Sequence, residues 1–328
     1  MKFAIIGDLH FKKTKDIETN YRNKVMAFVR NYLKENNIQN IIQLGDVFHE
    51  RKTLDINLIK ETKDILNKYF DFNVSYIIGN HDTYFKNTNT VNSLELITEN
   101  IIDTPKNIDN SLLLPWITED NYQASIQLLA ESKQKYCFGH FEINGFQLMK
   151  GILAEEKLDS SVFKNFKKVF SGHYHLPQET RNIVYVGSLF QNDFGDEGTE
   201  KRFFVLDDET DELTEVKIPY TLFKKIELKD ESDLDMDIDS LKDKIVKCVV
   251  YIPTSIKREQ LLDKITENLT DYSIIDNSKL AETQNNFVAD EDFVNIFSDY
   301  LGQNQGYDEN RKNDLSKLFV ETYSKLFN

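Results

Sequence analysis

The first two thirds of the chain alternate short apolar runs with longer amphipathic segments. The apolar runs, rich in β-branched and aromatic residues, are residues 2–6, 40–44, 74–78, 112–114, 135–138, 167–170 and 182–186. Between them, apolar residues recur at helical spacing in residues 20–35, 56–69, 90–99 and 121–132. Strands that alternate with helices are typical of layered α/β proteins. We therefore predict an α/β fold over this part of the chain.

The pattern changes after residue 200. Residues 201–206 and 213–218 flank a polar segment and predict an antiparallel hairpin that closes the sheet. We place a domain boundary at Pro219, so that residues 1–219 form the first domain. The acidic stretch 230–243 is expected to be a solvated connection.

A second, smaller region follows this boundary. Residues 245–252, 257–269 and 272–275 predict a strand, a helix and a strand, which gives a small α/β domain over residues 220–276. A unit of this size buries little surface, so we expect it to dock on the first domain. Residues 277–328 then contain a polar linker and two amphipathic helices, at 290–301 and 308–327.

Composition excludes several classes of protein. Hydrophobic residues make up 40% of the chain and charged residues 29%, as in soluble globular proteins. No apolar run approaches the roughly 20 residues that span a bilayer. Since the run at residues 1–7 leads directly into Asp8 and His10, it is not expected to be a secretory signal. We expect a cytoplasmic protein with no membrane partner, and the separate Cys137 and Cys248 are expected to be buried thiols.

The charge of the chain argues against one way of binding nucleic acid. With 40 basic and 55 acidic residues, the net charge is −15, which disfavours a broad basic surface for nucleic acid. A DNA partner would therefore need positive charge from elsewhere. Bound divalent cations or a second protein that grips the DNA could supply it.

Five short motifs follow apolar runs in order along the chain. They are GDLH at residues 7–10, GDVFH at 45–49, GNHD at 79–82, GH at 139–140 and GHYH at 172–175. Together they contain all six histidines of the protein. A single Gly-His pair is a weak signal, but ligand-binding loops of α/β folds lie at the carboxyl ends of strands. The ordered set therefore indicates one site that these loops share.

The residue types in these motifs are metal ligands. Imidazole, carboxylate and amide groups without a thiolate favour manganese, iron or zinc over a structural cysteine-bound zinc. The carboxylate of Asp46 has two oxygens and could bridge two cations about 3.5 to 4 Å apart, the spacing of two-metal phosphoryl chemistry. The glycines that precede the motifs allow sharp turns and close backbone approach.

The motif series resembles the calcineurin-like metallophosphoesterase superfamily. Within it, the chain is similar to the SbcD-like DNA repair nucleases, above all the recombination endonuclease subunits of tailed bacteriophages. The similarity runs from residue 1 through the small domain, and it is most specific at residues 139–151 (GHFEINGFQLMKG) and 171–175 (SGHYH). The resemblance implies a sheet sandwich with flanking helices, a small α/β cap domain and a C-terminal helical pair.

The resemblance also implies a set of ligands for two divalent cations, of which Mn²⁺ is favoured and Mg²⁺ is the alternative. The implied ligands of the first ion are Asp8, His10, Asp46 and His175, and those of the second are Asp46, Asn80, His140 and His173. The implied activity is metal-dependent exonuclease and endonuclease cleavage of DNA.

Three further residues receive roles beside the ions. His81 matches the family position that stabilises the transition state or protonates the leaving oxygen. For Asp82 two interpretations stay open: it orients the His81 imidazole, or it caps a helix. His49 is interpreted as a phosphate contact or as an aid to exonuclease activity, or alternatively as a surface histidine.

Partners follow from the resemblance as well. It implies that the small domain helps to position DNA and that the terminal helices bind an SbcC-like ATPase of the SMC family. The alternative for these helices is packing on their own domain. A homodimer is also implied, with residues 56–69 and 90–99 as candidate interface helices.

Two other functions remain as alternatives. The first is a metallophosphatase or small-molecule phosphodiesterase of the same fold. Protein phosphatases of the superfamily typically carry Gly-Asn-His-Glu, whereas this chain has Gly-Asn-His-Asp at residues 79–82, which favours the nuclease. The second is a noncatalytic scaffold, which typically lacks several ligands, whereas every ligand position is kept here.

Overall fold

The computed structural model describes residues 1–149, 151–154, 158–278, 311–312 and 315. The chain divides into two compact units. The first consists of Met1–Ile226, Asp237–Cys248 and Asp263–Ser273; the second consists of Glu227–Met236, Val249–Leu262 and the described residues from Ile274 onward. The two predicted terminal helices, at 290–301 and 308–327, lie outside the described residues except for positions 311, 312 and 315.

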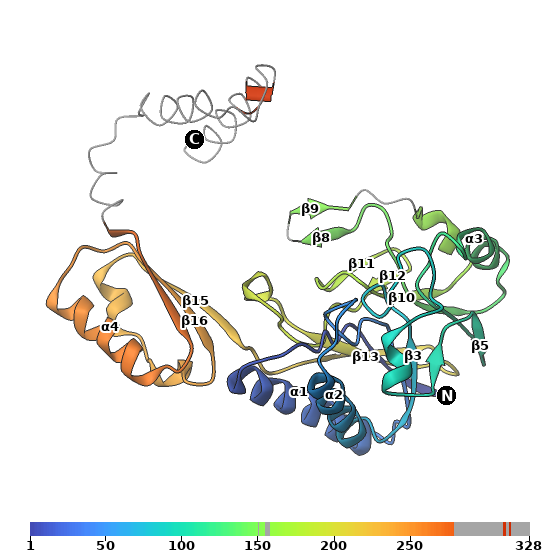
Figure 1. The fold of residues 1–328 in the computed structure, drawn as a ribbon, viewed down its shortest axis with the longest axis horizontal. Helices are drawn as coiled ribbons and strands as arrows, with labels where there is room; N and C mark the ends of the chain where they lie inside the picture. Colours follow the sequence, from blue (N-terminus) through green and yellow to red (C-terminus); the bar gives the residue numbers. More distant parts are fainter. Residues whose placement is uncertain (150, 155–157, 279–310, 313–314, 316–328) are drawn as a thin grey trace. The chain divides into compact units, whose positions relative to one another are not determined.

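Two six-stranded sheets form the body of the first unit (Figure 1). The strands of one are, in spatial order, β14 (Glu212–Lys217), β13 (Arg202–Asp207), β1 (Lys2–Ile6), β2 (Asn40–Gln43), β3 (Asn73–Ile77) and β4 (Ile101–Ile102). The strands of the other are β11 (Gln178–Thr180), β12 (Ile183–Tyr185), β10 (Lys168–Gly172), β7 (Tyr136–His140), β6 (Ser111–Leu114) and β5 (Lys106–Ile108). The central strands β1 to β4 are parallel to one another, as are β12, β10, β7 and β6.

Alternating side chains of these strands build a layered core. Phe3 and Ile5 of β1 join Phe138 of β7 and Phe170 of β10 in a cluster between the sheets. Ala4 and Ile6 of β1 point to the other face and pack with helical residues. Because successive side chains of a strand point to opposite faces, a strand buried on both faces reads as a continuous apolar run. The result is the predicted layered α/β sandwich.

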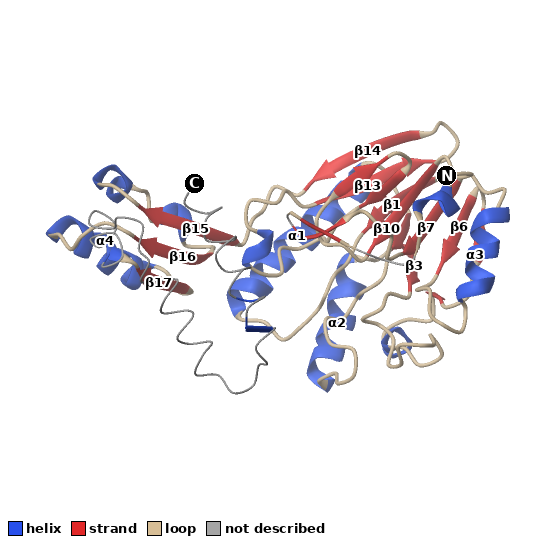
Figure 2. Ribbon diagram, turned by 90° about the horizontal axis from the view of Figure 1, so that it is seen from above, coloured by secondary structure: helices blue, strands red, loops and turns tan. Residues whose placement is uncertain are grey.

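Helices cover the outer faces of the two sheets. Helix α1 (Asp16–Glu35) buries Val25, Val29 and Leu33 in the same cluster as Leu66 of α2 (Ile56–Tyr69). Leu129 of α3 (Tyr122–Glu131) belongs to the cluster on the other sheet. Figure 2 shows α1 and α2 on one side of the strands and α3 on another. At the start of α2, Asp55 accepts a hydrogen bond from the backbone N–H of Asn57 (2.7 Å) and so caps the helix.

The predicted helix at residues 90–99 is wrong. This segment forms only one 3₁₀ turn, η1 (Ser93–Leu96), which the side chain of Asn92 caps. The residues before it are extended, since Tyr84 N donates to Val91 O (2.9 Å) and Thr83 pairs with Asn92. Pairing with the segment that follows His81 therefore outweighs local helical spacing. As a consequence, residues 90–99 do not supply an interface helix of the kind proposed for a dimer.

Later elements agree with the predictions at most positions. The 207–212 turn joins β13 and β14 as an antiparallel hairpin. Strands β15 (Phe223–Leu228), β16 (Ile245–Val250) and β17 (Tyr272–Asp276) form a three-stranded sheet, and helix α4 spans Ile256–Asn268. Strand β15 was not predicted.

The acidic stretch at 230–243 is more ordered than a solvated connection. It contains two 3₁₀ turns, η4 (Glu231–Asp235) and η5 (Asp239–Leu241). Leu234 and Leu241 are buried, so apolar residues inside the stretch anchor it to the protein. Cys137 and Cys248 are buried as expected. None of the helices among the described residues has both the length and the apolar character needed to cross a membrane.

Candidate metal centre

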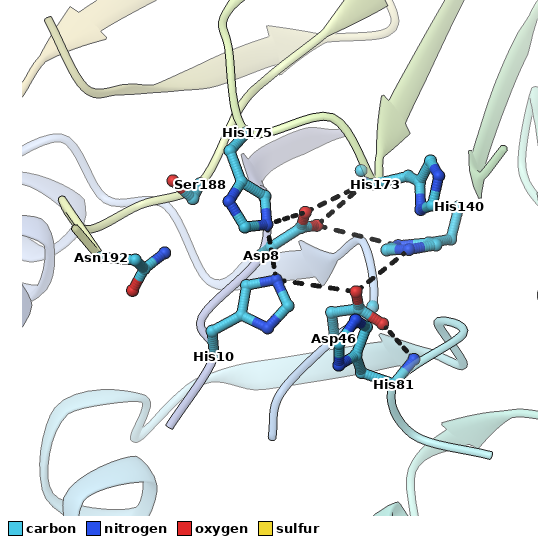
Figure 3. A network of polar contacts seen from close by, with 12 residues as sticks. Asp8, His10, Asp46, His81, His140, His173, His175, Ser188 and Asn192 are labelled. Atoms are coloured by element: carbon cyan, nitrogen blue, oxygen red, sulfur yellow. Dashed lines mark hydrogen bonds and ion pairs between the residues drawn. The ribbon is translucent and has the colours of Figure 1, made fainter. Parts of the chain in front are cut away.

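The five motifs lie at the carboxyl ends of five central strands. Asp8 and His10 follow β1, Asp46 follows β2, and Asn80 follows β3 in the first sheet. In the second sheet, His140 is the last residue of β7, and His173 and His175 follow β10. Because neighbouring strands within each sheet are parallel, their carboxyl ends share one edge. The two edges meet, so that six of the seven predicted ligands come from both sheets to one place (Figure 3), and the seventh, Asn80, contacts two of them.

The predicted ligands form two groups of converging ligand atoms, and a third group, made of His10, His49 and His81, shares His10 with the first. Asp8, His10 and His175 each offer an atom within 4.8 Å of the others, and Asp46, His140 and His173 do the same. Figure 3 shows His10 and His175 on one side of the two carboxylates and His140 and His173 on the other. In the first group, Nε2 of His175 and Nε2 of His10 are 2.7 Å apart. Two imidazole nitrogens therefore point at the same small volume.

Asp46 and Asn80 complete this arrangement. The Oδ2 atom of Asp46 lies 3.6 Å from His10 Nε2 and 3.4 Å from His140 Nε2, so it stands between the two groups. Asn80 Oδ1 is 2.9 Å from His140 Nε2 and 3.0 Å from His173 Nδ1. The carboxylate can thus bridge both groups, and the amide oxygen belongs to the second.

The backbone at the site is strained to bring these groups together. His10, Asp46 and His173 all have positive φ (45°, 56° and 89°), a region that costs non-glycine residues free energy and is common at functional sites. Gly45 has φ 102°, and a Cβ there would lie 2.6 Å from His140 Nδ1. A Cβ on Gly79 would collide with Asp46. These two glycines are therefore required for close approach, as the motif spacing suggested.

Burial and charge set the protonation of the ligands. Burial raises the pKa of Asp8 to about 7. Burial also opposes ionisation of Asp46, but the attraction of His140 and His10 outweighs it and holds the pKa of Asp46 well below its usual range. For His140, burial is outweighed by Asp46 and Asp8, which raise its pKa to about 9. Burial lowers the pKa of His10, and it lowers the pKa of His175 to about 4.

These shifts predict that two bound ions respond differently to pH. Metal binding at the second group requires His140 to lose its proton, and the pKa of His140 is raised to about 9. Metal binding at the first group requires only that Asp8 is ionised, and the pKa of Asp8 is about 7. We expect the Mn²⁺ affinity of the second site to fall about tenfold per unit between pH 8.5 and 7.5, while that of the first falls only below pH 7. Calorimetric titration with Mn²⁺ across this range checks the prediction; parallel loss of both ions would contradict it.

Asp82 has a different role from either expectation. Its Oδ2 accepts from the backbone N–H groups of Asp46 (2.8 Å) and Gly79 (2.9 Å), and its Oδ1 accepts from Val47 (3.0 Å). The Nδ1 atom of His81 instead faces the backbone carbonyl of His49. Asp82 is fully buried, and it neither orients the His81 ring nor caps a helix in the described residues. Its carboxylate ties the second motif to the third and so fixes the position of Asp46.

His81 and His49 lie together beside the first group. The backbone N–H of His81 donates to Asp46 Oδ1 (2.7 Å), and its ring stacks against that of His49 at 5.8 Å. The His10 ring lies 5.4 Å from His49 and 5.0 Å from His81. His49 is half-buried next to the site, so it is not simply a surface histidine.

Several supporting residues were not found from the sequence. Lys201, fully buried, donates to His175 O (3.2 Å), Ser188 Oγ (2.8 Å) and Asp196 Oδ1 (2.5 Å), so it supports the backbone of a candidate ligand from behind. Trp116 lies 5.7 Å from the His140 ring and 5.5 Å from the His173 ring. Trp116 is the only tryptophan of the chain, and this rarity could have drawn attention to it as a site residue. No motif in the sequence around Lys201 indicates that it lies at the site.

The donor set fits divalent metal ions. Each group offers imidazole nitrogens with carboxylate oxygens, which suits borderline and hard divalent cations. The sharing of Asp46 between the groups is the arrangement expected of a two-metal centre.

Comparison with known proteins finds similar chains among nucleases. The chain is 29% identical over 293 residues to exonuclease subunit 1 of Enterobacteria phage T4, covering 85% of this chain and 86% of the relative. It is 26% identical over 214 residues to the SbcD component of nuclease SbcCD from Staphylococcus saprophyticus, covering 53% of this chain and 55% of the relative. The solved structure of an archaeal phosphodiesterase aligns with a TM-score of 0.33 and 17% identity, over 66% of this chain and 99% of the other.

A family model also matches the part of the chain that carries the motifs. The model of the calcineurin-like phosphoesterases matches residues 1–177, which include all of the predicted ligands. More than half of the chain is covered, and the described structure has the layered sheets that the motifs require. This chain therefore belongs to the calcineurin-like phosphoesterase family.

Proposed function

We propose that this protein is a two-metal DNA nuclease, an SbcD-like protein that hydrolyses phosphodiester bonds beside an ATPase partner. The observation that carries the proposal is the position of Asp46, whose Oδ2 lies within 3.6 Å of His10 Nε2 and 3.4 Å of His140 Nε2. The likeness to the phage exonuclease subunit over most of both chains supports DNA as the substrate.

The ligands divide between the ions as the geometry suggests. Asp8, His10 and His175 would hold the first ion, and Asn80, His140 and His173 the second, with Asp46 shared. When bound, the cations would polarise the phosphate and lower the pKa of a water molecule. Manganese is our preferred metal because nitrogen and oxygen donors are mixed in both groups.

The His81 side chain is the candidate source of the proton for the leaving group. The His49 carbonyl fixes Nδ1 of His81, which leaves Nε2 of that ring to act toward the substrate. His81 sits next to Asp46 through its backbone N–H, so its distance from the bridged centre is set by the same loop. We propose that it gives a proton to the departing sugar oxygen.

Positive side chains beside the first group support a phosphodiester substrate. Lys12 and Arg22 are close enough to His49 to help burial lower its pKa. Arg22 is buried, stacks on Phe11 and Phe190 (5.5 and 5.4 Å), and donates to the carbonyl of His10 (3.2 Å). We propose that His49 contacts a phosphate at this edge. Local positive charges of this kind can attract a DNA phosphate although the net charge of the chain is −15.

Partners and the second half of the chain belong to the same proposal. We propose that residues 220–276 are a cap that positions DNA, that residues 290–328 bind the SMC-type ATPase, and that the protein forms a homodimer in which α2 is the remaining candidate helix. The relative that is a component of nuclease SbcCD supports the ATPase partner. Copurification with the ATPase, with and without residues 290–328, tests this part.

Metal removal is the direct test of the activity. Protein freed of metal by a chelator should cleave neither linear DNA nor an aryl phosphodiester, and Mn²⁺ should restore both reactions. A phosphomonoester and a phosphopeptide serve as controls for the phosphatase alternative. Rapid cleavage of those substrates with none of DNA would contradict the proposal, and an Mn²⁺-loaded protein that is inert on all four would be a scaffold.

A further inference from the structure

A pocket of about 560 Å³ adjoins the metal centre on the side of the second group. Its walls come from the segment after His81, from the segment that joins β6 to α3, from the start of α3 and from the segment after β7. The residues that line it include Lys86, Trp116, Glu119, Tyr122, Gln123 and Glu142. None of these residues has a role in the proposed reaction.

Two lining residues also touch the candidate ligands of the second ion. The Trp116 ring is 5.5 Å from His173 and 5.7 Å from His140, and Glu142 Oε1 is 3.4 Å from His173 Nε2. The pocket therefore lies beside the candidate ligands of the second ion. A group in this pocket would belong to a nucleotide next to the scissile phosphate.

The lining chemistry favours an aromatic and neutral ligand. Trp116 and Tyr122 offer ring surfaces, and such surfaces stack on nucleobases without regard to sequence. Glu119 and Glu142 stand against the single cation Lys86 in the lining, so a phosphate is disfavoured inside the pocket. The sugar–phosphate backbone would stay at the metal centre while the base enters.

The mouth of the pocket carries a hydrogen-bonding side chain. Gln123 is exposed there, and its amide can donate and accept. The edge of a nucleobase carries the complementary donors and acceptors.

We propose that this pocket binds the unpaired nucleobase of the nucleotide adjoining the scissile phosphate. A base within a duplex is stacked on both faces and cannot enter, so the ligand is a base of single-stranded DNA or of a frayed end. This inference rests on the proposed nuclease activity. The pocket would then be occupied only where the two DNA strands are separated at the point of cleavage.

The test uses single-stranded oligonucleotides with one cleavable phosphodiester, all other linkages being methylphosphonates. One series carries thymine on the nucleotide 5′ or 3′ to that bond, and the matched series carries an abasic tetrahydrofuran there. Gln123→Ala removes the exposed amide at the mouth, and Tyr122→Ala removes a ring that belongs to none of the buried core clusters. Gln127→Ala, an exposed residue on the same helix and outside the pocket lining, is the matched control.

Wild-type protein with Mn²⁺ should show a lower KM for the thymine substrate than for the abasic one. Tyr122→Ala should raise the KM for the thymine substrate about tenfold. Gln123→Ala should raise it by a smaller factor without lowering the unfolding temperature, and neither variant should change the abasic KM or the Mn²⁺ content. Equal KM values for both substrates in the wild type, or equal effects of the variants on both, would overturn the pocket assignment while the nuclease stands. A wild-type protein that cleaves neither oligonucleotide nor an aryl phosphodiester would instead refute the proposed function.

Discussion

Asp46→Asn is expected to lower the affinity of the protein for both metal ions and to abolish cleavage of DNA. Asn has the same shape but lacks the negative charge, and its nitrogen cannot ligate a cation. Asp46 Oδ2 lies near a histidine of each ligand group, so its loss is expected to affect both ions at once. Loss of an outer hydrogen-bond partner of a metal ligand costs roughly 10- to 100-fold in metal affinity or activity. We expect a larger loss from a shared ligand.

The measurement is Mn²⁺ stoichiometry and affinity by calorimetry, together with the rate of DNA cleavage. Asp64→Asn is a matched control, because Asp64 is an exposed residue of α2 with an ion pair to Lys60. Circular dichroism establishes that each variant is folded. Retention of two tightly bound ions in Asp46→Asn would show that Asp46 does not bridge the centre.

His81→Asn is expected to lower the rate of DNA cleavage about 10²- to 10⁴-fold while the protein keeps its metal ions. The Asn side chain retains an N–H that can donate to the carbonyl of His49, so the loop with its backbone bond to Asp46 should persist. Only the group that would reach the leaving oxygen is removed. The expected change therefore falls on kcat, with little change in KM.

The leaving group decides which role His81 plays. An aryl phosphodiester releases a phenolate that needs no proton, whereas DNA releases a sugar alkoxide. A proton donor predicts a large defect of His81→Asn on DNA and a small one on the aryl substrate. Equal defects on both substrates would assign His81 to stabilising the charge of the transition state, and loss of Mn²⁺ would assign it to the structure of the site.

The candidate ligands could be predicted from the sequence because the fold presents them in a regular way. Each motif follows an apolar run, and a parallel strand delivers its last residues to a common edge. Local chemistry also determined α2, whose predicted limits match Ile56–Tyr69, since its cap and its apolar spacing lie within the segment. These are properties of a few consecutive residues, so the tertiary structure adds little to them.

Other features depend on contacts between distant segments, and only the tertiary structure decided them. Residues 90–99 have helical spacing but pair with the segment after His81, and Asp82 next to that histidine accepts from the backbones of Asp46 and Gly79 rather than from its neighbour. Trp116 carries no motif, and it becomes a wall of a pocket only because β7 and β10 bring His140 and His173 beside it. The sequence by itself determined which candidate ligands follow the central strands. The folded structure determined how far apart they stand and what surrounds them, because those quantities depend on the packing of two sheets rather than on any local preference.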